Sequence, residues 1–405
     1  MLLHWIWFAQ AQKVSLHVKQ MLLQRFRDPE EIYCADWPAF SGIDGLTADA
    51  VDALTDKDLT QAQKILDDCN KKDIRVLTYG DDQYPARLRN LYDPPMVLYF
   101  KGTLPDWDDD PVIGIVGTRK ASVYGMNTAL RFGKEIAACG AIVVSGCATG
   151  IDAMAMEGAL EAGRPVVGVL GCGVDIVYPA KNRQLFAKVE AQGCLLSEYA
   201  PGEAPVGWHF LQRNRIITGM SNGLLVVEAP ERSGALNSAR HAMEQGRDVF
   251  VVPGNVGVES CAGSNALLEE QALPALSGWH VMREYEAQYP GKVCKRDLPA
   301  ATERPLAMVA QQQALPQQAA PAKERTDKKS VDKNEKSTYS VVNNPPSALN
   351  QQEQSILARI GSQPVTVDEV IAQTDMNPGT VKSILTKLVI KGVVRNHPGG
   401  RVSRK

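Results

Sequence analysis

The central part of the sequence alternates short apolar runs with helix-length segments. The runs are rich in β-branched residues, which favours buried strands. This alternation is typical of repeated βαβ units and predicts a mainly parallel sheet. Right-handed crossovers place the carboxyl ends of such strands at one edge, where these sheets bind ligands. The runs are Val112–Val116, Ile142–Val144, Val166–Leu170, Leu224–Val227 and Val249–Val252.

Glycine-rich turns follow these runs. Glycine lets backbone N–H groups approach an anion closely, and a helix N-terminus adds a favourable dipole. A single turn of this kind is usually plain turn geometry, but several at one edge predict a site for several phosphates or a phosphodiester chain. Asp152 and Asp175, which lie in these turns, are interpreted as helix caps. The turns begin with Gly117-Thr118-Arg119, Ser145-Gly146, Gly171-Cys172-Gly173, Glu228-Ala229 and Pro253-Gly254.

Charge and motifs limit what this edge could bind. The 405 residues carry a net charge of −2, so a nucleic-acid site must be a local patch. No G-x-G-x-x-G follows the first run and no P-loop motif occurs, so neither a dinucleotide nor a nucleoside triphosphate is indicated. The eight cysteines form no C-x-x-C pair and no zinc-type group with histidine, so we expect no metal, no cofactor and a reducing cytoplasm.

Two arginines interrupt an apolar stretch further along the chain. Arg213 and Arg215 are two positions apart, so on a helix their side chains point roughly 200° apart. They cannot both lie on one solvated face. Two interpretations stay open for each arginine: its side chain faces the anion site at the sheet edge, or it forms an internal ion pair with Glu198 or Glu228.

Composition divides the chain into four parts. Residues 1–100 mix helical patterns with turns, and their apolar start lacks a basic n-region, which predicts a buried first helix and no signal peptide. Residues 101–285 hold the α/β pattern. Residues 286–346 are too polar to bury a core, so we expect a disordered linker. Residues 347–405 are basic and run helix, helix, helix, hairpin, which is typical of a winged helix. No segment is apolar for long enough to span a membrane.

Together these blocks resemble the DNA processing protein A family, also called DprA or Smf. The resemblance covers the whole α/β region, and blocks in family order are far more specific than any single motif. They are Gly117-Thr118-Arg119, Ser145–Asp152, Gly171–Asp175 with Asn182, Ser197-Glu198-Tyr199, Arg213–Ile217, Val227-Glu228-Ala229 with Ser233–Leu236, Val252-Pro253-Gly254 and Gly263-Ser264-Asn265.

The resemblance implies an extended Rossmann-like α/β fold with a mainly parallel sheet, an N-terminal helical domain like a sterile alpha motif and a C-terminal winged helix. It also implies a cytoplasmic homodimer that binds single-stranded DNA, protects incoming strands in natural transformation and helps load RecA onto them, without catalysis. By motif match, the expected DNA-binding residues are Gly117, Thr118, Arg119, Ser145, Gly146, Gly150, Asn182, Arg213, Arg215, Ser233, Gly234 and Asn265.

Two positions depart from the family pattern. Thr118 stands where the first loop usually has serine, and because it keeps a hydroxyl we expect the anion contact to survive. Met156 stands where the family often has a histidine after Gly-Ile-Asp. A histidine-based chemical role at that position is therefore not expected.

Nucleotide hydrolysis and a structural adaptor role are the alternatives to DNA binding. Lysine-decarboxylase-like phosphoribohydrolases share this layout, but they carry Pro-Gly-Gly-x-Gly-Thr-x-x-Glu where this chain has Ala229–Gly234, which disfavours nucleotide hydrolysis. A structural adaptor acting through the winged helix would leave the central loops without a role. The winged helix itself has two equal interpretations, contact with duplex DNA or contact with a protein.

Overall fold

The computed structural model describes residues 1–11 and 13–296, and in the C-terminal part residues 351–361, 363, 365–374, 381, 384–385, 388, 393–397 and 401–404. The chain forms two compact units, Met1–Gln318 and Ala319–Lys405. Each unit has its own hydrophobic core.

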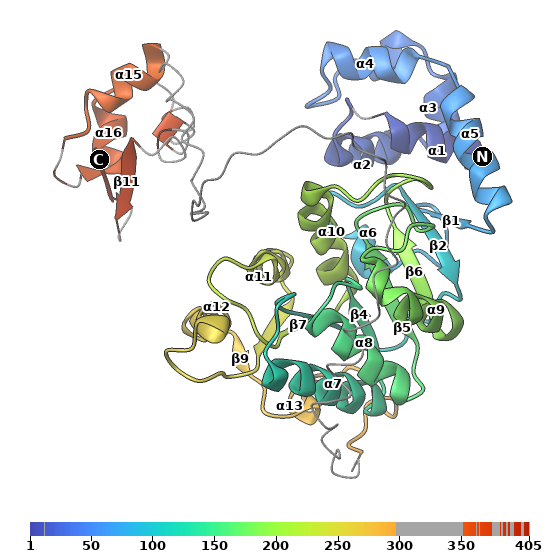
Figure 1. Cartoon of the computed structure of the whole chain (residues 1–405). Coiled ribbons are helices and arrows are strands. Elements are labelled where there is room, and N and C mark those ends of the chain that lie inside the picture. The colour runs from blue at the N-terminus through green and yellow to red at the C-terminus, as the bar shows by residue number, and fades with distance from the viewer. Residues whose placement is uncertain are drawn as a thin grey trace, which may run out of the picture. The chain divides into compact units, whose positions relative to one another are not determined.

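A nine-stranded sheet organises the first unit (Figure 1). Its strand order is β1-β2-β6-β5-β4-β3-β7-β8-β9. The strands from β6 to β9 run parallel, whereas β2 is antiparallel to both β1 and β6. The five predicted runs form β3, β4, β5, β7 and β8, which confirms the mainly parallel α/β core. The strands are β1 (Arg75–Thr78), β2 (Val97–Gly102), β3 (Val112–Val116), β4 (Ile142–Ser145), β5 (Val166–Leu170), β6 (Cys194–Ser197), β7 (Gly223–Val226), β8 (Asp248–Val251) and β9 (Leu273–Pro274).

Helices cover both faces of this sheet. Successive residues of a strand point to opposite faces, so Ile113 packs in one core and Val112 in the other. The first core includes α7 and α8, which approach so closely that a Cβ at Gly133 or Gly158 would collide with the backbone of the other helix. The second includes α10 and α11. The helices are α6 (Ala86–Arg89), α7 (Val123–Ala138), α8 (Ile151–Glu161), η2 (Ala180–Asn182), α9 (Arg183–Gln192), α10 (Gly207–Met220), α11 (Gly234–Glu244), α12 (Glu259–Glu269), α13 (Gly278–Met282) and η3 (Arg283–Tyr285).

The N-terminal helices form a layer that leads into β1 (Figure 1). The first helix buries the run Trp5–Phe8, as the sequence predicted. Side-chain oxygens of Ser15 and Thr47 accept backbone N–H groups and cap α2 and α4. The layer consists of α1 (Leu2–Gln10), α2 (Leu16–Arg25), α3 (Pro29–Cys34), η1 (Trp37–Phe40), α4 (Ala48–Thr55) and α5 (Thr60–Lys71).

The α/β domain extends beyond both boundaries that the sequence suggested. Strand β1 lies before residue 101 and β2 spans it, yet the two strands pair with each other and β2 pairs with β6. At the other end, residues 286–296 were predicted to begin the linker. They stay packed on the domain instead, because Tyr289 and Val293 are buried in its core.

The second unit contains the elements of a winged helix. Thr366 and Glu369 form a reciprocal capping box at the start of α16. The wing strands pair in the order β10-β12-β11. The predicted linker from residue 297 on, and most of the predicted recognition helix at 380–390, lie outside the described residues. The described elements are α15 (Gln351–Leu357), β10 (Val365–Thr366), α16 (Val367–Ala372), β11 (Val394–His397) and β12 (Arg401–Arg404).

In the part of the chain that the structure describes, no helix combines the length and the apolar character that crossing a bilayer requires.

All eight cysteines are described, and each is a free thiol. Cys34 is exposed, whereas most of the others are buried.

Lys19 is an unusual side chain of the helical layer. It is 2% exposed, its Nζ donates a hydrogen bond to the Ala9 carbonyl at 2.8 Å, and it lies over the Phe8 ring. Burial lowers the pKa of Lys19 from 10.5 to about 7, against the opposing charge of Glu198. At pH values between about 7 and 10.5, Lys19 is protonated in the unfolded chain but has lost its proton in the folded chain. Stability therefore rises with pH through this window.

We expect pH to separate Lys19→Met from the parent protein. Between pH 6 and pH 9 the parent's free energy of unfolding should rise by roughly 1–3 kcal/mol relative to the variant, which has no titrating group there. Urea unfolding at both pH values measures the difference. Lys64→Met on the exposed side of α5 is the control, and it should follow the parent. Parallel profiles for the parent and Lys19→Met would contradict the expectation.

Candidate nucleic-acid interface

The loops that follow the parallel strands gather at one edge of the sheet. Strands β5, β4, β3 and β7 are neighbours and parallel, so their carboxyl ends lie side by side (Figure 1). Helices α7 and α8 begin at this edge, directly after the loops that follow β3 and β4. The edge therefore combines two helix N-termini with glycine-rich backbone, an arrangement that suits anions.

A buried carboxylate fixes the first loop. Glu228, at the end of β7, is 1% exposed, and its Oε2 accepts hydrogen bonds from the backbone N and the Oγ of Ser122 at 2.9 and 3.1 Å. The Ser122 Oγ in turn accepts the Gly125 N–H and caps α7. The Thr118 N–H donates to the Glu228 carbonyl at 2.7 Å. Glu228 thus holds both ends of the loop that carries Arg119.

The second loop is tied to the first. The Ile151 N–H donates to the Thr118 carbonyl at 3.3 Å, and the Thr149 hydroxyl donates to the Arg119 carbonyl at 3.2 Å. Within the second loop, Asp152 accepts the Gly146 N–H at 3.2 Å. These bonds join the loops after β3 and β4 into one rigid surface.

Arg213 supports this surface from beneath. It is 3% exposed, donates to the Val169 carbonyl, and packs so tightly under Gly146 that a Cβ there would collide with its guanidinium. Burial lowers the pKa of Arg213, and the Asp152 charge opposes that effect. Burial likewise raises the pKa of Asp152. Arg213 is therefore a buried positive charge directly under the second loop.

Arg215 points the other way and forms an internal ion pair. Its Nη2 donates to both carboxylate oxygens of Glu198, at 2.8 and 2.7 Å, and its Nε lies 3.1 Å from Asp93 Oδ2. This decides between the two interpretations of Arg215, in favour of an ion pair with Glu198. The opposed directions of Arg213 and Arg215 follow from their spacing on α10.

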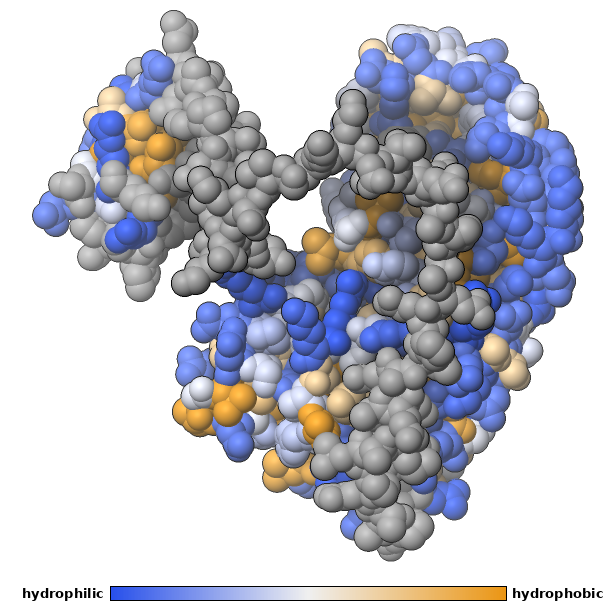
Figure 2. Space-filling model, viewed as in Figure 1, coloured by the Kyte–Doolittle hydropathy of each residue, from blue (hydrophilic) through white to orange (hydrophobic). Residues whose placement is uncertain are grey.

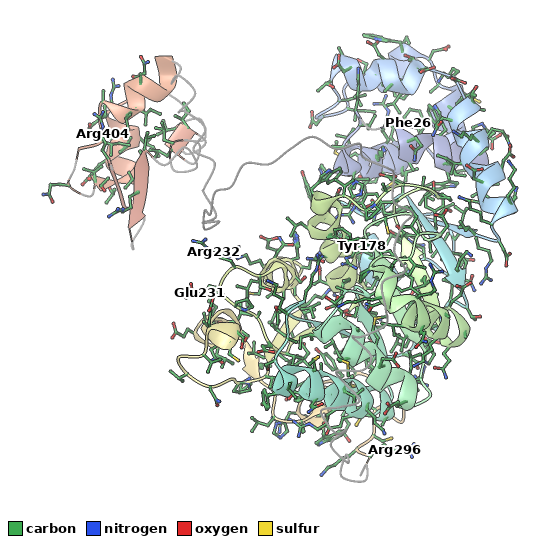
Figure 3. The ribbon with its side chains drawn as sticks, viewed as in Figure 1. Phe26, Tyr178, Glu231, Arg232, Arg296 and Arg404 are labelled. Carbon is green, nitrogen blue, oxygen red and sulfur yellow. The ribbon has the colours of Figure 1, made fainter. Side chains whose placement is uncertain are left out.

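Exposed aromatic and basic side chains border the loops. The guanidinium of Arg119 lies 5.2 Å from the centre of the Phe210 ring, and the Tyr178 ring packs against the Phe210 ring with their centres 5.4 Å apart. Tyr178, labelled in Figure 3, is 42% exposed, and Trp208 on the first turn of α10 is 59% exposed. We call Arg119, Tyr178 and Phe210 the aromatic platform. No sequence motif predicted its two rings, although aromatic residues near a basic residue at strand ends were a signal that could have found them.

Further basic residues lie on loops of the same edge. Lys120, Lys181 and Arg232 are exposed and follow β3, β5 and β7. Figure 3 shows Arg232 and its neighbour Glu231 on the outside of the α/β domain. The acids Asp152 and Glu228, by contrast, are buried. The accessible charge of the edge is therefore mostly positive.

The remaining predicted residues hold the backbone of the edge. The Asn182 amide donates to the carbonyls of Cys147 and Ala148, and the Ser145 hydroxyl donates to the Ile115 carbonyl. Ser233 caps α11, which begins at Gly234. The Asn265 side chain both accepts from and donates to the Gly254 backbone. Gly117, Thr118 and Gly150 lie in the two joined loops. Direct contact between any of these residues and DNA stays a prediction.

No grouping of three or more His, Cys, Asp or Glu side chains suited to a metal ion occurs among the described residues. The donor set of the edge consists of backbone N–H groups, hydroxyls, amides and guanidinium groups. Such donors recognise an anionic oxygen rather than a cation.

We expect Gly150→Ala to damage this edge more than a matched glycine change. Gly150 has φ 80° and ψ −126°, and a Cβ there would collide with the Thr118 carbonyl. Gly163 has a similar φ of 74°, but a Cβ would meet no atom within 4 Å. Gly150→Ala should lower the free energy of unfolding by roughly 2–4 kcal/mol and Gly163→Ala by about 1 kcal/mol. Urea unfolding measures both, and equal losses would contradict the tight coupling of the two loops.

Comparisons with known proteins agree with this geometry. Residues 75–286 match the family model described as DNA recombination-mediator protein A, and residues 343–400 match the DprA winged helix domain. Protein Smf of Synechocystis sp. is 30% identical over 99% of this chain and 98% of its own length. The DNA processing protein DprA of Bacillus subtilis is 38% identical over 55% of this chain and 74% of its own length.

A solved structure shares the fold. The X-ray structure of DNA processing protein A from Streptococcus pneumoniae aligns with a TM-score of 0.62 and 31% identity, over 70% of this chain and 98% of that one. Its match covers more than the α/β domain alone, and the family model begins at Arg75, the first residue of β1. The chain therefore belongs to the DNA recombination-mediator protein A family, known as DprA or Smf.

Proposed function

We propose that the chain binds single-stranded DNA along the carboxyl edge of its sheet, in the cytoplasm, and passes the strand to the recombinase RecA without catalysing a reaction. The observation that carries the proposal is the position of Arg119. Its guanidinium is exposed and lies over Phe210, on a loop whose backbone is fixed at both ends by Glu228. A phosphate at this loop would meet the Arg119 charge, and the neighbouring base would meet the rings.

The aromatic platform favours single strands over duplex DNA. A base can stack on an exposed ring only when it is not already paired and stacked within a duplex. Tyr178 is exposed and packs against Phe210, the ring over which Arg119 lies, so it offers such a ring face. Stacking of this kind tolerates any sequence, which suits a protein that must accept any incoming strand.

The non-catalytic part of the proposal rests on the two acids of the edge. A general acid or base needs access to its substrate. Asp152 and Glu228 are buried, and each accepts backbone hydrogen bonds that hold a loop. Their geometry supports a structural role.

The proposal that RecA is the partner rests on the family to which the chain belongs. A mediator of recombination delivers a strand to the protein that pairs it with a homologous sequence, and RecA is the partner that the family resemblance implies. We propose that the same handover serves natural transformation, in which the bound strand would be protected until RecA assembles on it. Faster RecA assembly on oligothymidylate in the presence of this protein is the direct test.

An apolar surface beyond the last strand supports a homodimer. Strand β9 lies at the end of the sheet, and Val256, Leu273 and Leu276 near it are 97%, 43% and 63% exposed. Figure 2 shows apolar side chains on the surface in the region of α12 and β9. An unpaired edge strand with exposed apolar neighbours is typical of a protein–protein contact.

The winged helix would add a second contact. Arg395 and Arg404 are exposed on its β11 and β12 strands, and Arg404 is labelled in Figure 3. Duplex DNA and an acidic protein surface would both suit these arginines.

Arg119→Ala should weaken strand binding without unfolding the protein. Loss of one charge-assisted hydrogen bond should cost roughly 1.5–3 kcal/mol of binding free energy. Fluorescence anisotropy with a labelled oligothymidylate measures this loss. The matched control is Arg283→Ala, because Arg283 is also exposed but lies away from the carboxyl edge. Its neighbour Tyr285 donates a hydrogen bond to Asp248, at the amino end of β8.

The same titration at several salt concentrations tests the phosphate contact. The slope of log K against log salt should be about −0.7 for each phosphate neutralised, so Arg119→Ala should make it shallower by about that amount. Unchanged affinity and slope in a folded Arg119→Ala protein would overturn the assignment of the site.

Leu276→Glu should shift a homodimer toward monomers. A charge placed in a buried apolar contact disfavours association by several kcal/mol. Sedimentation equilibrium of the parent and the variant compares their association constants. Trp37→Glu, at an equally exposed apolar residue of the helical layer, is the control and should leave association unchanged. A parent protein that stays monomeric at tens of micromolar would refute the dimer.

A further inference from the structure

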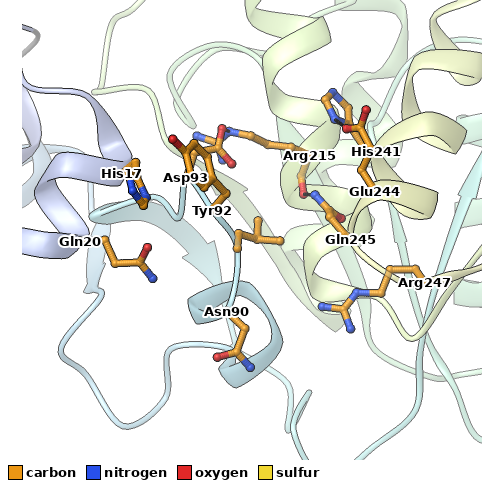
Figure 4. Close-up of a pocket in the computed structure, with 11 residues that line it drawn as sticks. His17, Gln20, Asn90, Tyr92, Asp93, Arg215, His241, Glu244, Gln245 and Arg247 are labelled. Carbon is orange, nitrogen blue, oxygen red and sulfur yellow. Dashed lines mark hydrogen bonds and ion pairs between the residues drawn. The ribbon is translucent and has the colours of Figure 1, made fainter. Parts of the chain in front are cut away.

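A pocket lies between the helical layer and the α/β domain, away from the carboxyl edge. It has a volume of about 740 Å³, within the usual range for small-molecule sites. One of its walls is Arg247, the residue directly before β8, so the pocket lies toward the amino ends of the strands. Figure 4 shows its lining, which comes from α2, the segment before β2, α10 and the end of α11.

Four buried polar atoms in this lining lack a hydrogen-bond partner within the described chain. They are the donors Arg215 Nη1 and Arg247 Nε, the acceptor Gln245 Oε1, and His17 Nδ1, which serves as either. Arg215 itself is only 3% exposed. Buried polar groups are normally satisfied, so a set of donors and an acceptor around one cavity indicates a polar ligand.

The charges of the pocket are nearly balanced. Arg215 is already neutralised by Glu198 and Asp93, and Glu244 lines the pocket as well as Arg247. Three primary amides, those of Gln20, Asn90 and Gln245, complete the polar wall. This lining does not favour a bare phosphate. It favours a neutral group that presents both donors and acceptors.

An aromatic pair gives the pocket a stacking surface. The rings of His17 and Tyr92 stack with centroids 4.1 Å apart and an interplanar angle of 13°. Tyr92 is 73% exposed, so its other face is available to a planar ligand. A flat heterocycle on this ring could direct its edge at the amides and the unpartnered guanidinium atoms.

We propose that this pocket binds a nucleobase, either of a free nucleotide or of a DNA strand. A nucleobase is planar, neutral and carries donors and acceptors along one edge, so it matches the stack, the amides and the balanced charge. Arg213 and Arg215 then belong to two different sites on opposite sides of α10. The pocket is separate from the proposed strand-binding site at the carboxyl edge. An experiment can therefore disprove either proposal without disproving the other.

Titration of the full chain with deoxyadenosine, dAMP and inorganic phosphate, followed by saturation-transfer NMR and calorimetry, tests the proposal. Deoxyadenosine and dAMP should bind with similar affinity, and phosphate alone should not compete. Tyr92→Ala should weaken dAMP binding about 5- to 150-fold, the range that loss of one stacked base contact gives. Gln245→Leu, from a different element, should weaken it as well.

Two control variants separate this site from the rest of the protein. Trp37→Ala removes an exposed ring outside the pocket, and Arg119→Ala damages the strand site; both should bind dAMP like the parent. Crosslinking of an oligonucleotide that contains 4-thiothymidine to the segment around Tyr92 would identify the base of a strand as the occupant. Binding of dAMP without that crosslink would identify a free nucleotide.

The proposal is overturned by any of three results. The first is the absence of deoxyadenosine and dAMP binding up to millimolar concentration. The second is dAMP binding that Arg119→Ala abolishes and Tyr92→Ala leaves intact. The third is binding of phosphate alone that matches the binding of dAMP.

Discussion

A buried carboxylate is the interaction on which the carboxyl edge depends. Glu228 follows β7, yet it fixes the loop that follows β3, through Ser122 on one side and Thr118 on the other. This contact needs Gly125, because a Cβ there would occupy the position of the carboxylate. The glycine, the serine and the acid therefore act as one unit. Together they turn the ends of two neighbouring strands into a single support for Arg119.

The parallel core could be predicted from the sequence, whereas its borders could not. Runs such as Val112–Val116 are apolar at every position because both faces of the sheet are covered, and that pattern is easily recognised. Strand β1 contains Arg75 and Thr78 within four residues and pairs only along one side, so it has no comparable signal. Residues 286–296 look polar and contribute isolated anchors such as Tyr289, which only the folded domain reveals.

The candidate site was predictable where it depends on backbone and not where it depends on packing. Glycine turns and Arg119 follow strands directly, so their place at the edge comes from topology alone. Tyr178 and Phe210 meet through the long loops after β5 and β6, and no local pattern specifies where those loops fold. The spacing of Arg213 and Arg215 predicted opposite directions, but the identity of each partner required the arrangement of α10 on the sheet.

The hydrogen bonds that join the loops after β3 and β4 have a thermodynamic consequence. A surface that is already ordered loses little conformational entropy when it binds, so the protein contributes almost none of the ordering cost. For the single strand proposed as the ligand, that cost would fall on the strand, whose sugar–phosphate backbone gives up its own freedom. Selectivity among strands would then reflect their stiffness and self-stacking in solution more than any base-specific contact. A rigid protein surface of this kind senses the flexibility of its ligand.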